Sequence, residues 1–125
     1  MDIFEKFLKD HNVAKNFGFN WENYMEIIEQ INFELAEVKD EIEKSDHVAL
    51  QKELGDVLHA CFELVAFLGM DIKETLEKSI AKIGKRYEVM QELAQADGIL
   101  DFAKISREMK LAYWEKTKQQ LKSVE

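Results

Sequence analysis

The stretch ELAEVKDEIEKSDHVALQKELGD, residues 34–56, decides the fold expected of this 125-residue chain. It contains two acidic pairs of the same spacing, Glu34-x-x-Glu37 and Glu53-x-x-Asp56, and each pair lies in an apolar run with helical spacing. Residues three apart lie on one face of a helix. Two helices that pack antiparallel through the polar segment between the pairs would therefore bring all four carboxylates together.

Four converging carboxylates oppose each other's ionisation, so the cluster either takes up protons or binds a cation. Oxygen ligands suit a hard divalent ion, and proteins typically hold Mg²⁺ with a few carboxylates, waters and the phosphates of a substrate. The two pairs therefore predict a magnesium site for a phosphate ester. A solvated acidic face is the alternative, because charged residues mostly lie exposed and pairs such as Glu26/Glu29 share the spacing.

Composition and length favour one all-α domain that spans residues 1–125. The chain has no Pro and only five Gly, while Glu, Lys, Leu and Ala are frequent, so good helix formers dominate and helix breakers are scarce. A chain of this length has room for one hydrophobic core. Long helices with short connections predict an up-and-down four-helix bundle or a dimer of smaller helical layers.

Apolar residues spaced by three and four place a short helix at residues 2–10, ending near Asn12, and four longer helices after it. The connection at 16–21 contains Gly18, and its aromatic residues are expected to dock on the core. The longer helices are expected over Tyr24–Ile42, Leu50–Leu68, Leu76–Leu93 and Phe102–Leu121, with caps at Ser45 or Asp46, at Asp71 and at Asp101.

The net charge and the cysteine content indicate which partners the protein can bind and in which compartment it is found. The formal net charge of −8 argues against a nucleic-acid polymer or an anionic membrane, since both bind basic surfaces. A small nucleotide is compatible with this charge, because metal ions and a few local cations can hold a triphosphate.

The single Cys61 is expected to be a buried, unpaired thiol. The longest apolar run, Leu64–Met70, is far too short to cross a bilayer, and we expect a soluble cytoplasmic protein.

The order of four short motifs along the chain resembles the MazG-type nucleoside triphosphate pyrophosphohydrolases, over roughly residues 21–120. The resemblance implies a four-helix-bundle-like MazG fold and a hydrolase that converts a (d)NTP or a modified nucleotide to the monophosphate and pyrophosphate, which is a house-cleaning role. The motifs are Glu34-x-x-Glu37, Glu53-Leu-Gly-Asp56, Lys82-x-x-Lys85-Arg86 and Trp114-Glu115-x-x-Lys118.

The same resemblance implies roles for the acidic residues. Mg²⁺, or Mn²⁺ in its place, would be bound by the acidic pairs, which would position water and neutralise charge at the phosphorus centre. One of the carboxylates could also orient or deprotonate the water, and the sequence does not distinguish which. The expected metal ligands, which are also the expected catalytic residues, are Glu34, Glu37, Glu53 and Asp56.

The resemblance also implies a substrate-binding set. Lys82 and Arg86 are one helical turn apart and would bind phosphate oxygens, Arg through its planar fork and Lys as a point charge. Trp114 and Lys118 are likewise one turn apart, so Trp114 could stack on a base while Lys118 reaches a phosphate. The alternatives are an ordinary basic helix face for the first two residues and a dimer interface for Trp114.

Three positions bear on how complete the site is. The family often has two adjacent acidic residues where this chain has Phe33 and Glu34, which leaves the number of metal ions open. It often has an Asn where Ile80 stands, which suggests a more apolar contact to the nucleotide. Gly55 costs about 1 kcal/mol of helix propensity, which suggests that a neighbour or ligand approaches the backbone closely there.

Two other classes stay open from the residues alone. His59 follows Asp56 by three, but a di-iron carboxylate bundle needs Glu-x-x-His on two helices, so we favour a partly buried polar side chain. A non-catalytic helical interaction module, with solvated acidic pairs and Trp114 as a partner anchor, would bind no magnesium. Apolar stripes that a short chain cannot fully cover predict a homodimer or a larger homo-oligomer.

Overall fold

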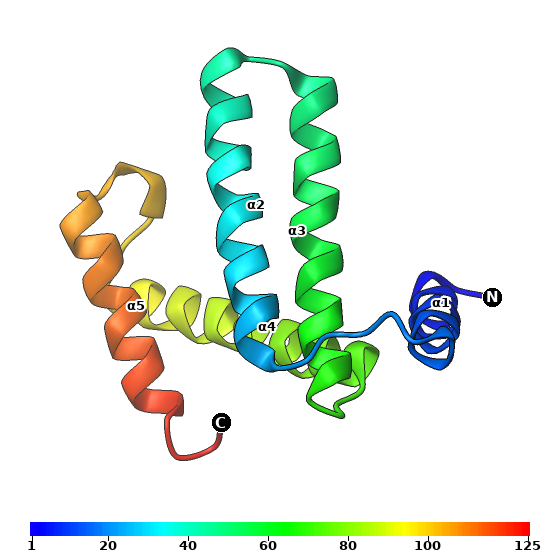
Figure 1. Ribbon diagram of the computed structural model, residues 1–125. Helices are drawn as coiled ribbons and strands as arrows, with labels where there is room; N and C mark the ends of the chain where they lie inside the picture. Colours follow the sequence, from blue (N-terminus) through cyan, green and yellow to red (C-terminus); the bar gives the residue numbers. More distant parts are fainter. The chain divides into compact units, whose positions relative to one another are not determined.

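Five α-helices make up most of the chain, and the computed structural model describes all 125 residues. The prediction of an all-α protein is confirmed. None of the helices combines the length and the hydropathy that a membrane-spanning segment needs. In chain order the elements are α1 (Ile3–Phe17), α2 (Tyr24–Lys44), α3 (His47–Phe67), α4 (Ile72–Ala96), the 3₁₀ turn η1 (Phe102–Lys104) and α5 (Arg107–Leu121) (Figure 1).

The chain divides into two compact units. The first, Met1–Thr75, contains α1, α2 and α3, and the second, Leu76–Glu125, contains α4 from Leu76 onward, η1 and α5. The two units are described separately below.

The N-terminal helix is longer than the sequence predicts. Asp2 caps α1 by accepting a hydrogen bond from the backbone N–H of Glu5 at 2.8 Å. The helix ends only at Gly18, whose φ of 107° is in the left-handed region that favours glycine. The predicted end near Asn12 is wrong, because no helix breaker occurs before Gly18.

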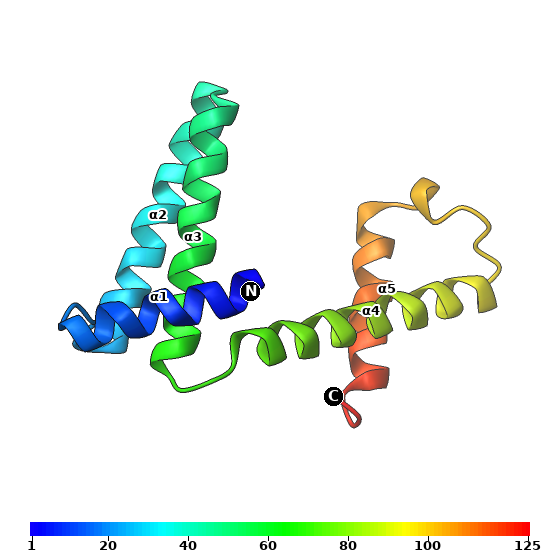
Figure 2. The same cartoon turned by 90° about the vertical axis from the view of Figure 1, so that its right-hand side faces the viewer.

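The helices α2 and α3 form an antiparallel hairpin, which both views show side by side (Figures 1 and 2). Asn23 and Glu26 form a capping box that starts α2. Ser45 ends α2 in the left-handed conformation, and Asp46 caps α3 by accepting from the N–H of Ala49 at 3.1 Å. Because these two residues alone connect the helices, the chain must turn back at once, as the sequence predicts.

Aromatic residues fix α1 against α3. The buried Phe7 of α1 contacts Phe62 edge-on, with ring centroids 5.6 Å apart, and His59 at 5.1 Å. The aromatics of the following connection behave differently: Phe17 is 84% exposed and Phe19 is 73% exposed. The prediction that the aromatic residues of this connection dock on the core is therefore wrong for Phe17 and Phe19, whereas Trp21 is half-buried.

The second unit is held by contacts between α4 and the segments that follow it. Tyr113 of α5 is buried and donates a hydrogen bond of 2.7 Å to Asp97, just past the end of α4. That hydrogen bond, together with burial, raises the pKa of the Tyr113 hydroxyl above its usual range. Asp101 caps the short turn η1, while Ser106 caps α5. The predicted start of the last helix at Phe102 is therefore wrong.

Candidate metal and phosphate sites

An acidic cluster forms where α2 and α3 face each other. Glu34 and Glu37 lie one turn apart on α2, and Glu53 comes from α3. Each offers a carboxylate oxygen, and these three oxygens all lie within 4.8 Å of one another. All three residues are half-buried. The hairpin thus brings together three of the four carboxylates that the sequence predicts to converge.

Glu53 is the most perturbed member of this cluster. Its Oε2 atom is buried and has no hydrogen-bond partner. The pKa of Glu53 is raised from 4.5 to about 7, first because a proton on it would be shared with Glu34, then through Glu37 and through burial. These carboxylates can hydrogen-bond one another only when one of them carries a proton. A cation or a proton is therefore needed to stabilise the cluster.

The fourth predicted ligand, Asp56, lies outside the cluster. It is exposed on α3, one turn after Glu53, and lines a neighbouring cavity together with Glu34. Glu34 itself accepts a hydrogen bond of 2.6 Å from Gln30, which orients its carboxylate. Aspartate is one methylene shorter than glutamate, so the same helical spacing carries its oxygens less far.

A cavity of about 470 Å³ opens beside the acidic cluster. It is built from α1, the connection after it, α2 and α3, so all of its walls belong to the first unit. Two aromatic rings, two amides and several charged groups converge there, which suits a flat, polar heterocycle. The lining residues with such side chains are Phe19, Asn20, Trp21, Gln30, Glu34 and Asp56.

Two histidines lie on the same cavity. His11 Nδ1 is 2.8 Å from Glu63 Oε2, and both side chains are 16% exposed. His59 is exposed and contacts the ring of Phe7. The three-carboxylate cluster contains no histidine, whereas a di-iron carboxylate site of the kind considered above needs two Glu-x-x-His motifs.

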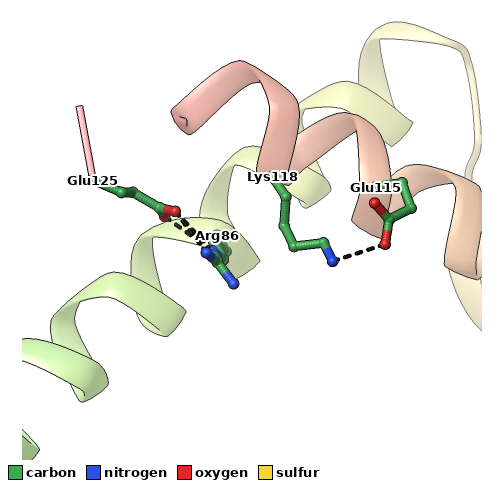
Figure 3. A network of polar contacts seen from close by, with 4 residues as sticks. All are labelled: Arg86, Glu115, Lys118 and Glu125. Atoms are coloured by element: carbon green, nitrogen blue, oxygen red, sulfur yellow. Dashed lines mark hydrogen bonds and ion pairs between the residues drawn. The ribbon is translucent and has the colours of Figure 1, made fainter. Parts of the chain in front are cut away.

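The basic residues predicted to bind phosphate lie on one face of α4 in the second unit. Lys82 is exposed, whereas the Arg86 side chain is only 17% exposed. Arg86 donates from Nε to Glu125 Oε2 at 2.9 Å and from Nη2 to Glu125 Oε1 at 2.6 Å (Figure 3). Pairing with Arg86, and secondarily the charge of Lys82, lowers the pKa of the Glu125 carboxyl, although its burial acts against this.

The predicted base-stacking residue, Trp114, belongs to the same group of contacts. The guanidinium carbon of Arg86 lies 5.6 Å from the centroid of the Trp114 ring, which is cation–π distance. The ring of Tyr87 lies 5.9 Å from it on a tilted plane. Lys118 is paired with Glu115 at 2.8 Å on α5 (Figure 3). Lys82, Arg86, Trp114 and Lys118 thus lie on the two long helices of one unit.

The prediction of a close approach at Gly55 is wrong within this chain. A Cβ atom added there would meet no heavy atom within 4 Å, and the same holds for Gly84 on α4. No part of the chain therefore requires a glycine at either position.

Sequence reasoning missed the residues that orient the predicted ones. Gln30 could have been found from its i,i+4 spacing to Glu34, which is a common helix hydrogen-bond spacing. In the sequence, the cavity residues Phe19 and Trp21 stand out only as aromatic residues of a connection between helices. Glu125 had no signal at all, since its contact with Arg86 joins residues 39 positions apart.

Comparison with known proteins agrees with these motifs. The model of the MazG nucleotide pyrophosphohydrolase domain matches residues 22–91, which include both acidic pairs, Lys82 and Arg86. The nucleoside triphosphate pyrophosphohydrolase/pyrophosphatase MazG of Thermotoga maritima is 34% identical over 105 residues, which is 84% of this chain and 40% of that protein. The nucleoside triphosphate pyrophosphohydrolase of Escherichia coli (strain K12) is 27% identical over 107 residues, with the same two shares. The chain therefore spans 40% of the length of these relatives.

Proposed function

Because the chain belongs to the MazG nucleotide pyrophosphohydrolase domain family, we propose that it is a magnesium-dependent enzyme that hydrolyses a nucleoside triphosphate to the monophosphate and pyrophosphate. The observation that supports this most is the convergence of Glu34, Glu37 and Glu53 within 4.8 Å. The two relatives described above are named for this activity.

The donor set of the acidic cluster fits a hard divalent cation. All of its ligand atoms are carboxylate oxygens, and the buried Oε2 of Glu53 has no partner within the chain. We assign Glu34, Glu37 and Glu53 as ligands of Mg²⁺, with Mn²⁺ as a substitute, and Asp56 as the fourth ligand on the adjacent turn. When bound, the ion would supply positive charge at the phosphate oxygens and lower the pKa of a water.

The remaining steps belong to side chains of the chain itself. The carboxylate cluster would hold the attacking water in place, and one of its carboxylates would accept the proton of that water. Lys82, Arg86 and Lys118 would neutralise the oxygens of the triphosphate and of the departing pyrophosphate. Water oxygen would replace the oxygen that joins the nucleoside monophosphate to pyrophosphate.

We further propose that the cavity beside the acidic cluster holds the nucleoside. Phe19 and Trp21 offer rings for stacking, while Asn20 and Gln30 offer amide donors and acceptors to a base edge. Glu34 and Asp56 line the same cavity, so a nucleoside held there would lie next to the proposed metal ligands. Trp114 keeps its predicted role as a second stacking residue.

We also propose a homodimer or a larger homo-oligomer. Large apolar side chains stand exposed along the hairpin, and exposed apolar surface that gathers into a large patch normally marks an interface. Sedimentation at micromolar concentration should therefore show at least a dimer, and a monomer would contradict the proposal. The exposed residues include Phe33, Leu35 and Ile42 of α2 and Val48, Leu54 and Leu58 of α3.

The activity is tested by a screen of the purified protein against common and modified nucleoside triphosphates, with magnesium and an assay for pyrophosphate. We expect release of pyrophosphate and of the monophosphate in equal amounts. The Glu53→Gln and Asp56→Asn variants should lose this activity while keeping the helical circular dichroism. Undiminished hydrolysis in chelator, or full activity of both variants, would refute the assigned site.

A further inference from the structure

Arg86 is paired within its own chain. Its Nε and Nη2 groups donate to both oxygens of Glu125, and its guanidinium carbon lies 5.6 Å from the centroid of the Trp114 ring. The Arg86 and Glu125 side chains are only 17% and 16% exposed. This is a two-point, charge-assisted pair, which is the strong form of the interaction, and it joins α4 to the segment after α5 (Figure 3).

The carboxylate of Glu125 lies where a phosphate would bind. The Nε and Nη2 edge of a guanidinium matches two oxygens of a carboxylate or of a phosphate equally well. The positive charge of Lys82, the other residue on α4 that is assigned to phosphate binding, also lowers the pKa of the Glu125 carboxyl. Arg86, with the charge of Lys82 nearby, thus already holds an anion that belongs to the chain.

The backbone around Glu125 allows this anion to be displaced. The helix α5 ends at Leu121, and the N–H groups of Val124 and Glu125 both donate to the carbonyl of Leu121, at 3.0 and 3.1 Å. One turn after the helix therefore places Glu125 beside Arg86. Its release would break the pair with Arg86 and the contacts of this turn, and it would leave the Tyr113–Asp97 contact of the unit in place.

We propose that Glu125 is an internal competitor of the substrate: its carboxylate occupies the phosphate position at Arg86, and a polyphosphate must displace it to bind. This proposal rests on the proposed role of Arg86 in phosphate binding. It makes Glu125 a residue that weakens the affinity for triphosphate and pyrophosphate. The same competition would favour release of the pyrophosphate product, because the carboxylate returns to Arg86 as the product leaves.

The test measures binding of inorganic tripolyphosphate to the full chain by calorimetry, without divalent ions, so that a cation on the acidic cluster contributes nothing. Glu125→Gln should bind tripolyphosphate about threefold to tenfold more tightly, because a partly exposed ion pair no longer competes. Glu88→Gln is the matched control. Glu88 lies on α4, two residues after Arg86, and its carboxylate pairs with Lys85. The control therefore removes one negative charge close to Arg86 without removing the partner of Arg86.

Arg86→Gln separates this proposal from the proposed function. If Arg86→Gln weakens binding and Glu125→Gln strengthens it more than Glu88→Gln does, competition is supported. Unchanged or weaker binding by Glu125→Gln overturns competition, and weaker binding would make Glu125 a positioning residue for Arg86. Failure of Arg86→Gln to change binding, or no binding by any of the proteins, overturns competition together with the phosphate role of Arg86. Tighter binding without hydrolysis of any nucleotide would leave competition standing and refute the activity alone.

Discussion

Glu53 of α3 and Glu34 of α2 present carboxylate oxygens within 4.8 Å of each other, although the two residues come from different helices. The contact is unfavourable when both are ionised, and it raises the pKa of Glu53 to about 7. The metal-free hairpin therefore keeps an electrostatic cost where the acidic pairs of α2 and α3 meet.

This contact predicts how the stability of the metal-free protein depends on pH. In the folded state Glu53 holds its proton up to about pH 7, whereas in the unfolded chain its pKa has the ordinary value of 4.5. The folded state therefore binds more protons between these values, and its contribution to the free energy of unfolding is lost as pH rises from 4.5 through 7. Thermal melts of the wild type and of Glu53→Gln in chelator should diverge across this range, with the variant becoming the more stable.

If the melting temperatures of the wild type and of Glu53→Gln change by the same amount between pH 4.5 and 7, the raised pKa of Glu53 is contradicted. Glu29→Gln on α2 provides a control, since it removes an exposed carboxylate outside the cluster. We expect its effect on the unfolding free energy to stay within about 0.5 kcal/mol, as for ordinary surface changes.

Magnesium should stabilise the folded protein by an amount that grows with the magnesium concentration. The gain in free energy of unfolding is RT ln(1 + [Mg²⁺]/Kd), so melting temperatures should rise steadily along a magnesium series at constant ionic strength. Asp56→Asn and Glu53→Gln should respond much less than the wild type, because each removes a proposed ligand. If Asp56→Asn responds as the wild type does, Asp56 is not a ligand and the metal is held by the other three residues.

Two tryptophans can be compared for base stacking. Trp114→Ala is predicted to raise KM for the nucleotide by one to two orders of magnitude, since stacking is worth roughly 1–3 kcal/mol per base. Trp21→Ala should raise KM by a similar factor if the cavity in the first unit holds the base. Steady-state kinetics with both variants decides the question: a KM unchanged in one variant assigns that tryptophan to packing.

Gly55 and Gly84 form a matched pair for a stability test. Both lie within helices, and both have open space where a Cβ would go. Alanine at either position should stabilise the chain by about 0.4–1 kcal/mol, because it reduces the freedom of the unfolded state. Chemical denaturation measures this. A gain at Gly84 combined with a loss at Gly55 would show that a second subunit covers the backbone of α3 at that point.

The sequence was sufficient to predict the hairpin and three of its carboxylates. Helical spacing, the cap at Asp46, and the short polar segment between two apolar runs are local features, and they determine how α2 and α3 pair. The expected end of α1 was wrong because no local signal ends a helix between Asn12 and Gly18. The start of α5 was wrong because Asp101 and Ser106 are both good caps, and only the fold shows that the first serves a 3₁₀ turn.

The finer features of the site could not be predicted for a different reason. Helical spacing gives the face on which a side chain lies but not how far the side chain reaches. The spacing therefore predicts that Asp56 joins the three glutamates, although its shorter side chain lies outside their cluster. The pairing of Arg86 with Glu125 depends on how the chain folds back after α5, which no periodicity records.

The two-residue connection at Ser45 and Asp46 determines more than a change of chain direction. Glu37 and Glu53 lie equally far along the chain from Ser45, on opposite sides of it, so the length of the connection sets which turn of α3 faces which turn of α2. An inserted residue would change how far α3 starts from the end of α2, so that another turn of α3 would face Glu34 and Glu37, and Glu53 would leave the cluster. The number of residues in this turn thus determines whether the acidic cluster forms. The protein should therefore tolerate an insertion less well here than in any connection of the second unit.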